Sequence, residues 1–301
     1  MIYTITMNPA LDYVVDLPHF HIGEVNRIEK EHIYFGGKGI NVACVLKELG
    51  FACTCLGFVA GFTGQELQRG IKEELGLNSQ MIEVNQGMTR INVKIHSQTE
   101  TEINGIGPIV EKSDFEKLLK QMKNMNDDDV LILSGSVPSS LSQNVYCDVL
   151  KAIENRNIKT VVDATGQLLL DSLSYHPFLI KPNHHELAQM FNVKLNNLDD
   201  IEKYARKLQD MGARNVLISM AKEGSLLIDE NGERHLMGVC QGEVKNSVGA
   251  GDSMVAGFIA GYLSHLNYHE TLKLATASGG ATAFSSGLAT KTKIQELLKQ
   301  L

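Results

Sequence analysis

The sequence has no block of basic residues. Lys and Arg total 28 against 35 Asp and Glu in a chain of 301 residues, which gives a formal net charge of −7. Proteins that bind nucleic acids or anionic membranes usually carry a basic stretch, so neither partner is expected here. Any anion-binding site must therefore be local, built from backbone amides and a few placed cations.

The sequence also lacks a long apolar run and a paired set of cysteines. No segment approaches the ~20 apolar residues of a membrane span. Residues 1–6 carry no basic segment and are predicted to form a strand, not a signal peptide. The five cysteines are scattered, with no C-x-x-C pair. An odd set with apolar neighbours indicates buried free thiols in a reducing compartment, so we expect a cytoplasmic protein.

Short branched apolar runs alternate with segments of helical length over most of the chain. Three such runs are DVLILS at residues 129–134, KTVVD at 159–163 and NVLISM at 215–220. This alternation is typical of βαβ units around a mostly parallel, buried sheet, so the expected fold class is α/β. Capping-box patterns at Thr63 with Glu66 and at Ser113 with Glu116 predict two of the helix starts.

Two segments break this alternation. They lie at approximately residues 12–35 and 89–106, where YVVDL at 13–17 and RINVKI at 90–95 have the pattern of strands without a helix of their own. The two inserts are predicted to form a small sheet that protrudes from the main body. We therefore expect residues 1–301 to form one domain with this appendage.

The stretch NSVGAGDS at residues 246–253, followed by an apolar run at 254–263, predicts a glycine-rich turn that enters a helix. The first amides of a helix have no intrahelical acceptor, and with the helix dipole they form a site for phosphate oxygens. Asp252 lies in the first turn, where a carboxylate beside an anion site suits a base. Phosphoryl transfer requires this combination. For the motif in isolation, the alternative is an ordinary helix start with a favourable acidic residue.

A second glycine-rich turn, FGGKGINVA, occupies residues 35–43. It lacks the spacing of a Walker A loop and is not a dinucleotide fingerprint. Its glycines allow a close backbone approach, Lys38 offers a mobile cation, and Asn41 offers both a donor and an acceptor. Such a site suits a polyol, whereas for this motif in isolation a structural turn is the alternative.

In this order, the two turns resemble the signature motifs of the ribokinase-like (PfkB) carbohydrate kinases. The matching stretches are GGKGINVA at 36–43 and NSVGAGD at 246–252. NPALD at 8–12 is similar to the family's sugar-binding aspartate segment, and KPNHHE at 181–186 is similar to its Asn-x-x-Glu element. The resemblance covers nearly the whole chain. It implies a ribokinase-like three-layer αβα sandwich with a small β-sheet lid.

Other stretches resemble the phosphosugar branch of this family, the 1-phosphofructokinases and tagatose-6-phosphate kinases. They are GEVNR at 23–27, TRINVK at 89–94, TEIN at 101–104 and SGSVP at 134–138. Arg90 suits a phosphate already present on the sugar. The resemblance implies an ATP- and Mg²⁺-dependent kinase, foremost a 1-phosphofructokinase that converts fructose 1-phosphate to fructose 1,6-bisphosphate. Tagatose-6-phosphate kinase is the alternative. A non-catalytic sugar-phosphate sensor is the alternative of another class, and loss of Asp252 or its glycines would mark it.

The resemblance also implies the roles of individual residues. Asp252 would be the catalytic base, and the amides of the turn would hold the transferring phosphoryl group: Gly249, Ala250 and Gly251. The residues expected at the sugar and its phosphate are Asp12, Gly36, Gly37, Lys38, Asn41, Arg90 and Ser136. Those expected at the nucleotide are Lys181, Asn183, Ser219, Gly224, Ser247, Val248, Ala277 and Ala281. Glu186 and Asn183 would reach Mg²⁺ through water.

The predicted lid indicates that a second copy of the chain could be a partner besides the phosphosugar and ATP. A small sheet with open edges and an apolar face is rarely left bare in water. We therefore expect either a homodimer through the lids or closure of each lid over its own site.

Overall fold

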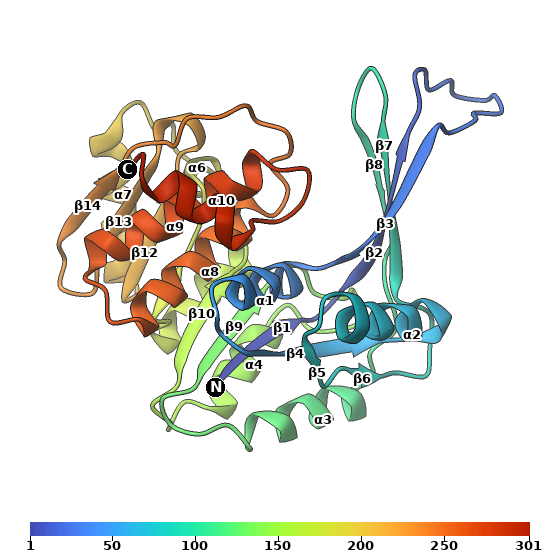
Figure 1. Ribbon diagram of the computed structural model, residues 1–301. Coiled ribbons are helices and arrows are strands. Elements are labelled where there is room, and N and C mark those ends of the chain that lie inside the picture. Colours follow the sequence, from blue (N-terminus) through green and yellow to red (C-terminus); the bar gives the residue numbers. More distant parts are fainter.

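A ten-stranded, mostly parallel sheet forms the centre of the computed structural model, which describes all of residues 1–301 (Figure 1). The strand order is β14-β13-β12-β11-β10-β9-β1-β4-β5, and β6 also pairs with β4. All pairs are parallel except those that β13 makes with β12 and β14. The strands are β1 (Ile2–Thr6), β4 (Cys53–Val59), β5 (Asn78–Ser79), β6 (Ile82–Glu83), β9 (Val130–Ser134), β10 (Lys159–Asp163), β11 (Leu179–Ile180), β12 (Asn215–Ser219), β13 (Ser225–Ile228) and β14 (Arg234–Met237).

The inner strands are largely buried because both faces of the sheet are covered. All five residues of β9 are buried. Val130 and Ile132 belong to one hydrophobic core, whereas Leu131 and Leu133 belong to the other. This division follows from the two-residue side-chain period of a strand.

Helices cover both faces of this sheet, giving three layers (Figure 1). One core contains side chains of α1 (Lys38–Glu48), α2 (Gly61–Arg69), α8 (Ala250–Leu263), α9 (Tyr268–Ala283) and α10 (Lys291–Leu298). The other contains side chains of α3 (Lys112–Met122), α4 (Val145–Ala152), α5 (Gly166–Ser172), α6 (His184–Phe191) and α7 (Leu198–Asp210). Three short turns of other helix types complete the elements: η1 (Gly70–Glu74), η2 (Leu173–Tyr175) and η3 (Ala221–Glu223). The predicted α/β class is confirmed.

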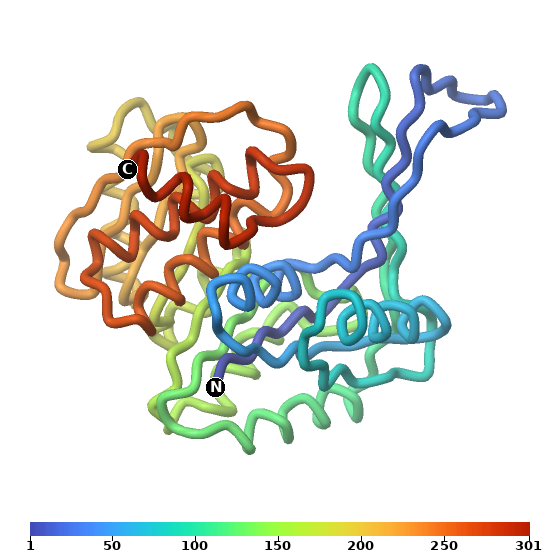
Figure 2. The backbone as a smooth tube through the Cα atoms, viewed as in Figure 1, coloured from blue at the N-terminus to red at the C-terminus, as the bar shows by residue number.

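A separate four-stranded sheet rises from the body as an arm, here called the lid (Figures 1 and 2). Its strands are β2 (Ala10–Asp16), β3 (Lys30–Gly36), β7 (Arg90–His96) and β8 (Thr101–Asn104), in the order β3-β2-β7-β8. Segments far apart in the sequence thus lie side by side, because β2 pairs in parallel with β7. β2 begins only a few residues after β1 ends, so the base of the lid lies beside the main sheet.

The two faces of the lid differ in polarity. Residues paired directly across strands point to the same face, and successive residues alternate between faces. One face therefore carries an apolar row across all four strands: Ile33, Tyr13, Val93 and Ile103. The opposite face carries polar side chains, including Asp12 and its partner Asn92.

The structure tests the predicted helix starts and the predicted burial of the cysteines. Both predicted capping boxes are wrong, because α2 and α3 begin before Thr63 and Ser113, and Thr63 instead donates its hydroxyl to the Thr89 carbonyl at 2.8 Å. Of the cysteines, three are buried as expected, whereas Cys44 and Cys147 are partly exposed. None of the helices combines the length and apolar composition that a membrane span requires.

Candidate active site

A cavity of about 370 Å³ lies beside the lid at the carboxyl ends of the parallel strands. β1 pairs with β4 on one side and β9 on the other, so the strand order reverses at β1, which is where open α/β sheets bind ligands. The residues that line the cavity are Ala10, Asp12, Gly37, Lys38, Asn41, Arg90, Asn92, Lys181, Asn183, Glu186, Ser219, Val248, Gly249, Gly251 and Asp252. The cavity therefore brings together most of the residues predicted for sugar, phosphate and nucleotide.

The glycine-rich turn at α8 leaves free backbone amides where the sequence predicts an anion site. Gly249 precedes the helix with φ 80°, a left-handed conformation that favours glycine. The amides of Gly251 and Asp252 have no protein acceptor, whereas the Ala250 amide donates to the Ser247 carbonyl at 3.2 Å. Ala250 also does not line the cavity. The free donors at this helix start are thus the two amides that follow Ala250.

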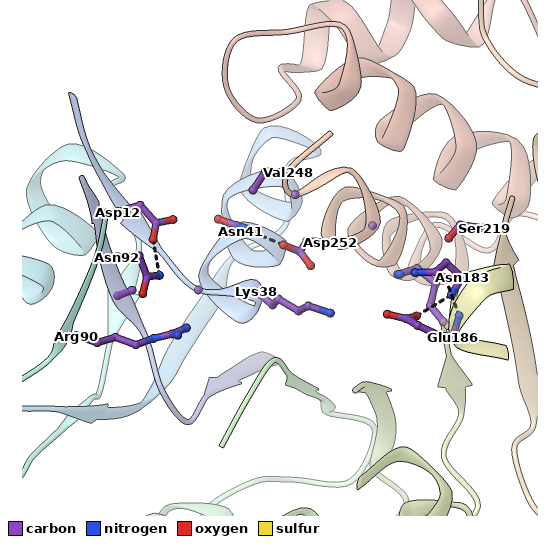
Figure 3. Close-up of a pocket in the computed structure, with 15 residues that line it drawn as sticks. Asp12, Lys38, Asn41, Arg90, Asn92, Asn183, Glu186, Ser219, Val248 and Asp252 are labelled. Atoms are coloured by element: carbon purple, nitrogen blue, oxygen red, sulfur yellow. Dashed lines mark hydrogen bonds between the residues drawn. The ribbon is translucent and has the colours of Figure 1, made fainter. Parts of the chain in front are cut away.

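Asp252 lies at the centre of the cavity, 5% exposed, in the first turn of α8. Asn41 of α1 donates its side-chain amide to the Asp252 carboxylate at 2.8 Å (Figure 3). Burial and the nearby Asp163 carboxylate raise the pKa of Asp252 to about 6, against the opposing effects of Asn41, Lys38 and Lys181. A carboxyl group with this pKa is charged at neutral pH and is a stronger proton acceptor than an ordinary aspartate.

Two lysines flank Asp252 and share a partner that the sequence reasoning did not select. Lys38 and Lys181 place their ammonium groups 3.1 Å and 3.5 Å from the two carboxylate oxygens of Asp163. Burial raises the pKa of Asp163, but Lys181 and Lys38 outweigh it, and the pKa lies below its ordinary value. Burial likewise lowers the pKa of Lys38, but Asp163 and Asp252 outweigh it, and the pKa is raised. Asp163 and Lys38 are therefore both charged at neutral pH.

Residues of the lid line one end of the cavity, away from Glu186 and Asn183 at the other end (Figure 3). Asp12 accepts a hydrogen bond from the Asn92 amide at 2.7 Å and lies 3.3 Å from the Lys94 ammonium. Gly36 does not line the cavity, but a Cβ at this position would lie 2.7 Å from an Asp12 oxygen, so its small size leaves room for that carboxylate. Asn92 was missed because a polar residue in a strand is usually only solvated.

A second cavity of about 540 Å³ adjoins the first. Gly37, Lys38 and Arg90 line both cavities, so the two cations stand at the boundary. Ser136, predicted beside the sugar phosphate, lines only the second cavity, together with Thr6, Asn8, Gly135, Val137, Gln143, Asp163, Ala164, Thr165, Gln167 and Leu168. The Thr6 hydroxyl and the Asn8 carbonyl oxygen of the side chain are buried there without a hydrogen-bond partner. Buried polar atoms of this kind usually bind a ligand or water.

Arg90 is held in place at this boundary. Its Nε donates to the Asn8 backbone carbonyl at 3.1 Å, and the Asn8 side-chain amide donates to the Ile106 carbonyl of the lid at 3.1 Å. Burial lowers the pKa of Arg90, with Asp12 opposing, but a guanidinium stays charged at neutral pH. Its terminal nitrogens remain available to an anion.

The start of α6 forms the end of the cavity opposite the lid (Figure 3). Asn183 accepts the Glu186 amide at 2.8 Å, and Glu186 accepts the Asn183 amide at 2.8 Å, which is a complete capping box. Only one Glu186 oxygen is used in this way. No cluster of three or more His, Cys, Asp or Glu is arranged to hold a metal, so an ion here would need ligands from a bound phosphate and water. Such sharing is usual for Mg²⁺.

The residues predicted for the nucleotide divide into two groups. Four of them line the cavity: Lys181, Asn183, Ser219 and Val248. The others do not: Gly224, Ser247, Ala277 and Ala281. Ser247 is exposed beside the α8 turn, but Ala277 and Ala281 are fully buried in the core, so their side chains offer no surface to a ligand in this structure. Gly224 is constrained by the backbone, since a Cβ there would lie 2.1 Å from the Met237 carbonyl oxygen.

The chain is similar to known carbohydrate kinases over its whole length. Residues 2–295 match the family model for the pfkB family carbohydrate kinases. The chain is 43% identical over 301 residues to the 1-phosphofructokinase of Bacillus subtilis, covering 100% of this chain and 98% of that protein. It is 35% identical over 303 residues to the D-tagatose-1-phosphate kinase of Bacillus licheniformis, with 100% and 98% covered. Phosphofructokinase-2 from Escherichia coli in complex with substrates and products has a TM-score of 0.93 at 25% identity, with 100% and 99% covered. Its tetrameric inhibited form has a TM-score of 0.91 at 25% identity, with 99% and 98% covered.

Proposed function

The chain belongs to the pfkB family of carbohydrate kinases, and we propose that it transfers the γ-phosphoryl group of ATP to the 6-hydroxyl of fructose 1-phosphate. The products are fructose 1,6-bisphosphate and ADP. The observation that carries this choice is the pair of cations, Lys38 and Arg90, at the boundary between the central cavity and the second cavity. A free sugar has no anion for Arg90, whereas a sugar phosphate does.

Asp252 is the general base in this proposal. As the 6-oxygen attacks the γ-phosphorus, Asp252 takes the hydroxyl proton, and ADP leaves from the opposite side of the phosphorus. Asp12, Asn41 and Asn92 bind sugar hydroxyls and hold the attacking oxygen in line, which is most of what phosphoryl transfer asks of a protein. The position of Asn41, bonded to Asp252 and lining the same cavity, supports this division of roles.

The transferring group carries negative charge that the start of α8 and the lysines stabilise. The amides of Gly251 and Asp252 donate to its oxygens, and the helix dipole adds to their effect. Lys38 and Lys181, which also line the cavity, supply positive charge beside the base. Gly249 permits the turn.

The nucleotide binds between α6, β12 and the α8 turn in this proposal, near Asn183, Ser219, Lys181 and Val248. Glu186 and Asn183 would hold Mg²⁺ through water, and the unbonded oxygen of Glu186 fits that role. When bound, Mg²⁺ neutralises charge on the β- and γ-phosphates.

The phosphate already on the sugar occupies the second cavity. Arg90, Lys38 and Ser136 are its direct partners in the proposal, and the unpartnered Thr6 and Asn8 oxygens bind through water or sugar hydroxyls. A phosphate held in the second cavity, while Asp252 lines the first, fixes which hydroxyl reaches the base.

A second candidate substrate is a tagatose phosphate. The relative of 35% identity named D-tagatose-1-phosphate kinase favours it, because tagatose 1-phosphate differs from fructose 1-phosphate only in configuration at C4. Tagatose 6-phosphate, the alternative from sequence, carries its phosphate at the other end and requires a reversed orientation in the site.

A homodimer through the lid is part of the proposal. The lid's polar face carries Asp12 and Asn92 toward the cavity, so closing the lid over its own site leaves the apolar row of the opposite face in water. In that row Ile33 is 55% exposed and Ile103 is 58% exposed. The lid of a second copy supplies a matching apolar surface. The tetrameric form of the Escherichia coli relative is in line with association in this family.

Coupled ADP release tests the substrate. The wild-type chain is assayed with fructose 1-phosphate, fructose 6-phosphate, both tagatose phosphates and free fructose. We expect the highest kcat/KM with fructose 1-phosphate. A preference of tenfold or more for a tagatose phosphate moves the assignment to the second candidate, and equal use of free fructose contradicts a phosphosugar kinase.

A further inference from the structure

One buried carboxylate at the site has no part in the roles described so far. Asp163 is the last residue of β10 and is 2% exposed. One of its oxygens lies 3.1 Å from the Lys38 ammonium, and the other lies 3.5 Å from that of Lys181. The two lysines come from different elements, Lys38 from the start of α1 and Lys181 from the segment after β11.

We propose that Asp163 is a positioning residue for phosphoryl transfer, which fixes the ammonium groups of Lys38 and Lys181 on the side of the cavity that faces Asp252. This inference rests on the proposed kinase function and goes beyond it, because it assigns a task to Asp163, which lines the second cavity but has no role in the transfer as proposed above. Asp163 acts through the lysines.

Both lysines need a partner to stay where they are. Lys38 has a flexible stem and a side chain that is 39% exposed, so without an ion pair its ammonium is free to point into water. Lys181 is 6% exposed and lies against the start of α8: a Cβ at Gly251 would be 2.9 Å from its nitrogen. The start of a helix repels a cation, so a buried ammonium there requires a compensating carboxylate. Asp163 is the carboxylate that meets this need.

The same arrangement sets the charge around the base. The charged groups that face Asp252 are Asp163 from β10, Lys38 from α1 and Lys181 from the segment after β11, with the Asn41 amide bonded to it. Glu186 of α6 acts on Lys38 from across the cavity. With Asp163 present, the lysines are held to a competing carboxylate and Asp252 keeps its basicity. Without it, both lysines are free to pair with Asp252, which weakens the base.

The first test needs no activity. Lys38 acylation by acetic anhydride at fixed pH is followed by peptide mass spectrometry, with the exposed Lys222 as internal standard. Asp163 raises the pKa of Lys38, so Asp163→Asn is expected to speed Lys38 acylation by about 3- to 10-fold. Asp163→Glu keeps the charge and is expected to stay near wild type. Unchanged Lys38 reactivity in a folded Asn variant overturns the proposal.

The second test uses the full chain as an enzyme. Asp163→Asn is expected to lower kcat by about 10- to 100-fold and to move the acid limb of the kcat profile down by about one pH unit. The matched control is Asp129→Asn, another buried aspartate, bonded to the N-terminal ammonium at 2.6 Å before β9. A purely structural role predicts that both variants lose stability and keep the wild-type pH profile.

The outcomes separate this inference from the proposed function. A wild-type chain that does not use fructose 1-phosphate refutes the substrate, while faster Lys38 acylation in Asp163→Asn still supports the positioning role. An active wild type whose Asn variant keeps kcat and pH profile overturns the role alone. Should the Asn variant fail to fold, the Glu variant decides: it is expected to lower kcat because it shifts the lysines, and a wild-type kcat overturns the proposal.

Discussion

At the scale of the residue, Asp252 combines burial with a like charge nearby, and both raise its pKa to about 6. A base must be deprotonated, so kcat/KM is expected to fall as the pH drops through this value and to level off above it. Asp252→Asn removes the base while nearly preserving shape. We expect turnover to fall by about 10² to 10⁴ with nucleotide affinity little changed. Initial rates across pH and a nucleotide titration measure both, and near-normal turnover in the variant rules out the role.

Asp252 is also expected to lower the free energy of unfolding at neutral pH. Its folded pKa lies above the unfolded value of 3.8, so the folded state binds a proton more tightly, and ionisation penalises folding above about pH 6. Asp252→Asn is therefore expected to stabilise the fold by roughly 1–3 kcal/mol at neutral pH. The gain must shrink as the pH falls from about 6 to 3.8, and it must vanish below 3.8, where the wild-type carboxyl is protonated in both states. Denaturant unfolding at several pH values checks this, and a gain independent of pH contradicts it.

Arg90 gives a prediction about substrate choice. If it binds the phosphate on the sugar, Arg90→Ala leaves that charge unpaired and is expected to lower kcat/KM for fructose 1-phosphate by about 10² or more. Free fructose has no phosphate to lose, so its kcat/KM is expected to change far less. The comparison is internal, because a misfolded variant loses both activities equally. Indifference of both substrates to the change removes Arg90 from the phosphate site.

Residues inside local motifs could be predicted from the sequence, and residues brought in by the fold could not. Asp252 and Gly249 belong to one short turn, and the sequence of residues 246–253 alone indicates its chemistry. Asp163 was seen only as the end of an apolar strand, because its partners Lys38 and Lys181 are remote in sequence and meet it through the sheet order. An acidic residue at the carboxyl end of a buried parallel strand was the available signal.

At the scale of the element, both predicted capping boxes are wrong, and the structure has a capping box at a site where none was predicted. Thr63 and Ser113 each precede a Glu by three residues, yet both lie inside their helices. Asn183 and Glu186 follow the same spacing and do form a capping box. The difference is tertiary: Thr63 bonds to the Thr89 carbonyl across the base of the lid, which competes with capping. Helix boundaries depend on such contacts and are therefore harder to predict than helix existence.

The capping box of α6 allows its structural and metal roles to be separated. Glu186→Gln keeps a capping side chain but removes the charge, so stability is expected to hold while the Mg²⁺ concentration for half-maximal activity rises about tenfold. Asn183→Ala loses the cap and is expected to cost about 1 kcal/mol of stability. Mg²⁺ titrations of activity and denaturant unfolding on both variants measure this. An unchanged Mg²⁺ requirement in the Gln variant contradicts metal binding at Glu186.

At the scale of the whole molecule, the α/β architecture was predictable because buried strands such as β9, β10 and β12 each carry their own apolar run. The lid was predictable only as two inserts with a strand pattern. Which face of it turns to the site depends on the register between β2 and β7, where Asp12 pairs with Asn92 and Tyr13 with Val93. A shift of one residue would exchange the polar and apolar faces. The sequence leaves that register open, and the structure sets it.

The register leads to a prediction about assembly. Ile33 and His32 are neighbours on β3 and point to opposite faces of the lid, and both are exposed. Ile33→Lys places a charge in the apolar row and is expected to weaken a lid-to-lid dimer at least about tenfold in dissociation constant. His32→Lys adds the same charge to the polar face and is expected to leave the dimer intact.

Sedimentation across a range of concentrations measures the association of the wild type and both variants. Closure of each lid over its own site predicts a monomer at all concentrations and no difference between the two lysine variants. Equal weakening by both variants indicates general damage to the lid. Loss of the dimer in Ile33→Lys alone identifies the face, because the two substitutions share a strand, a charge and an exposed position and differ only in the direction of the side chain.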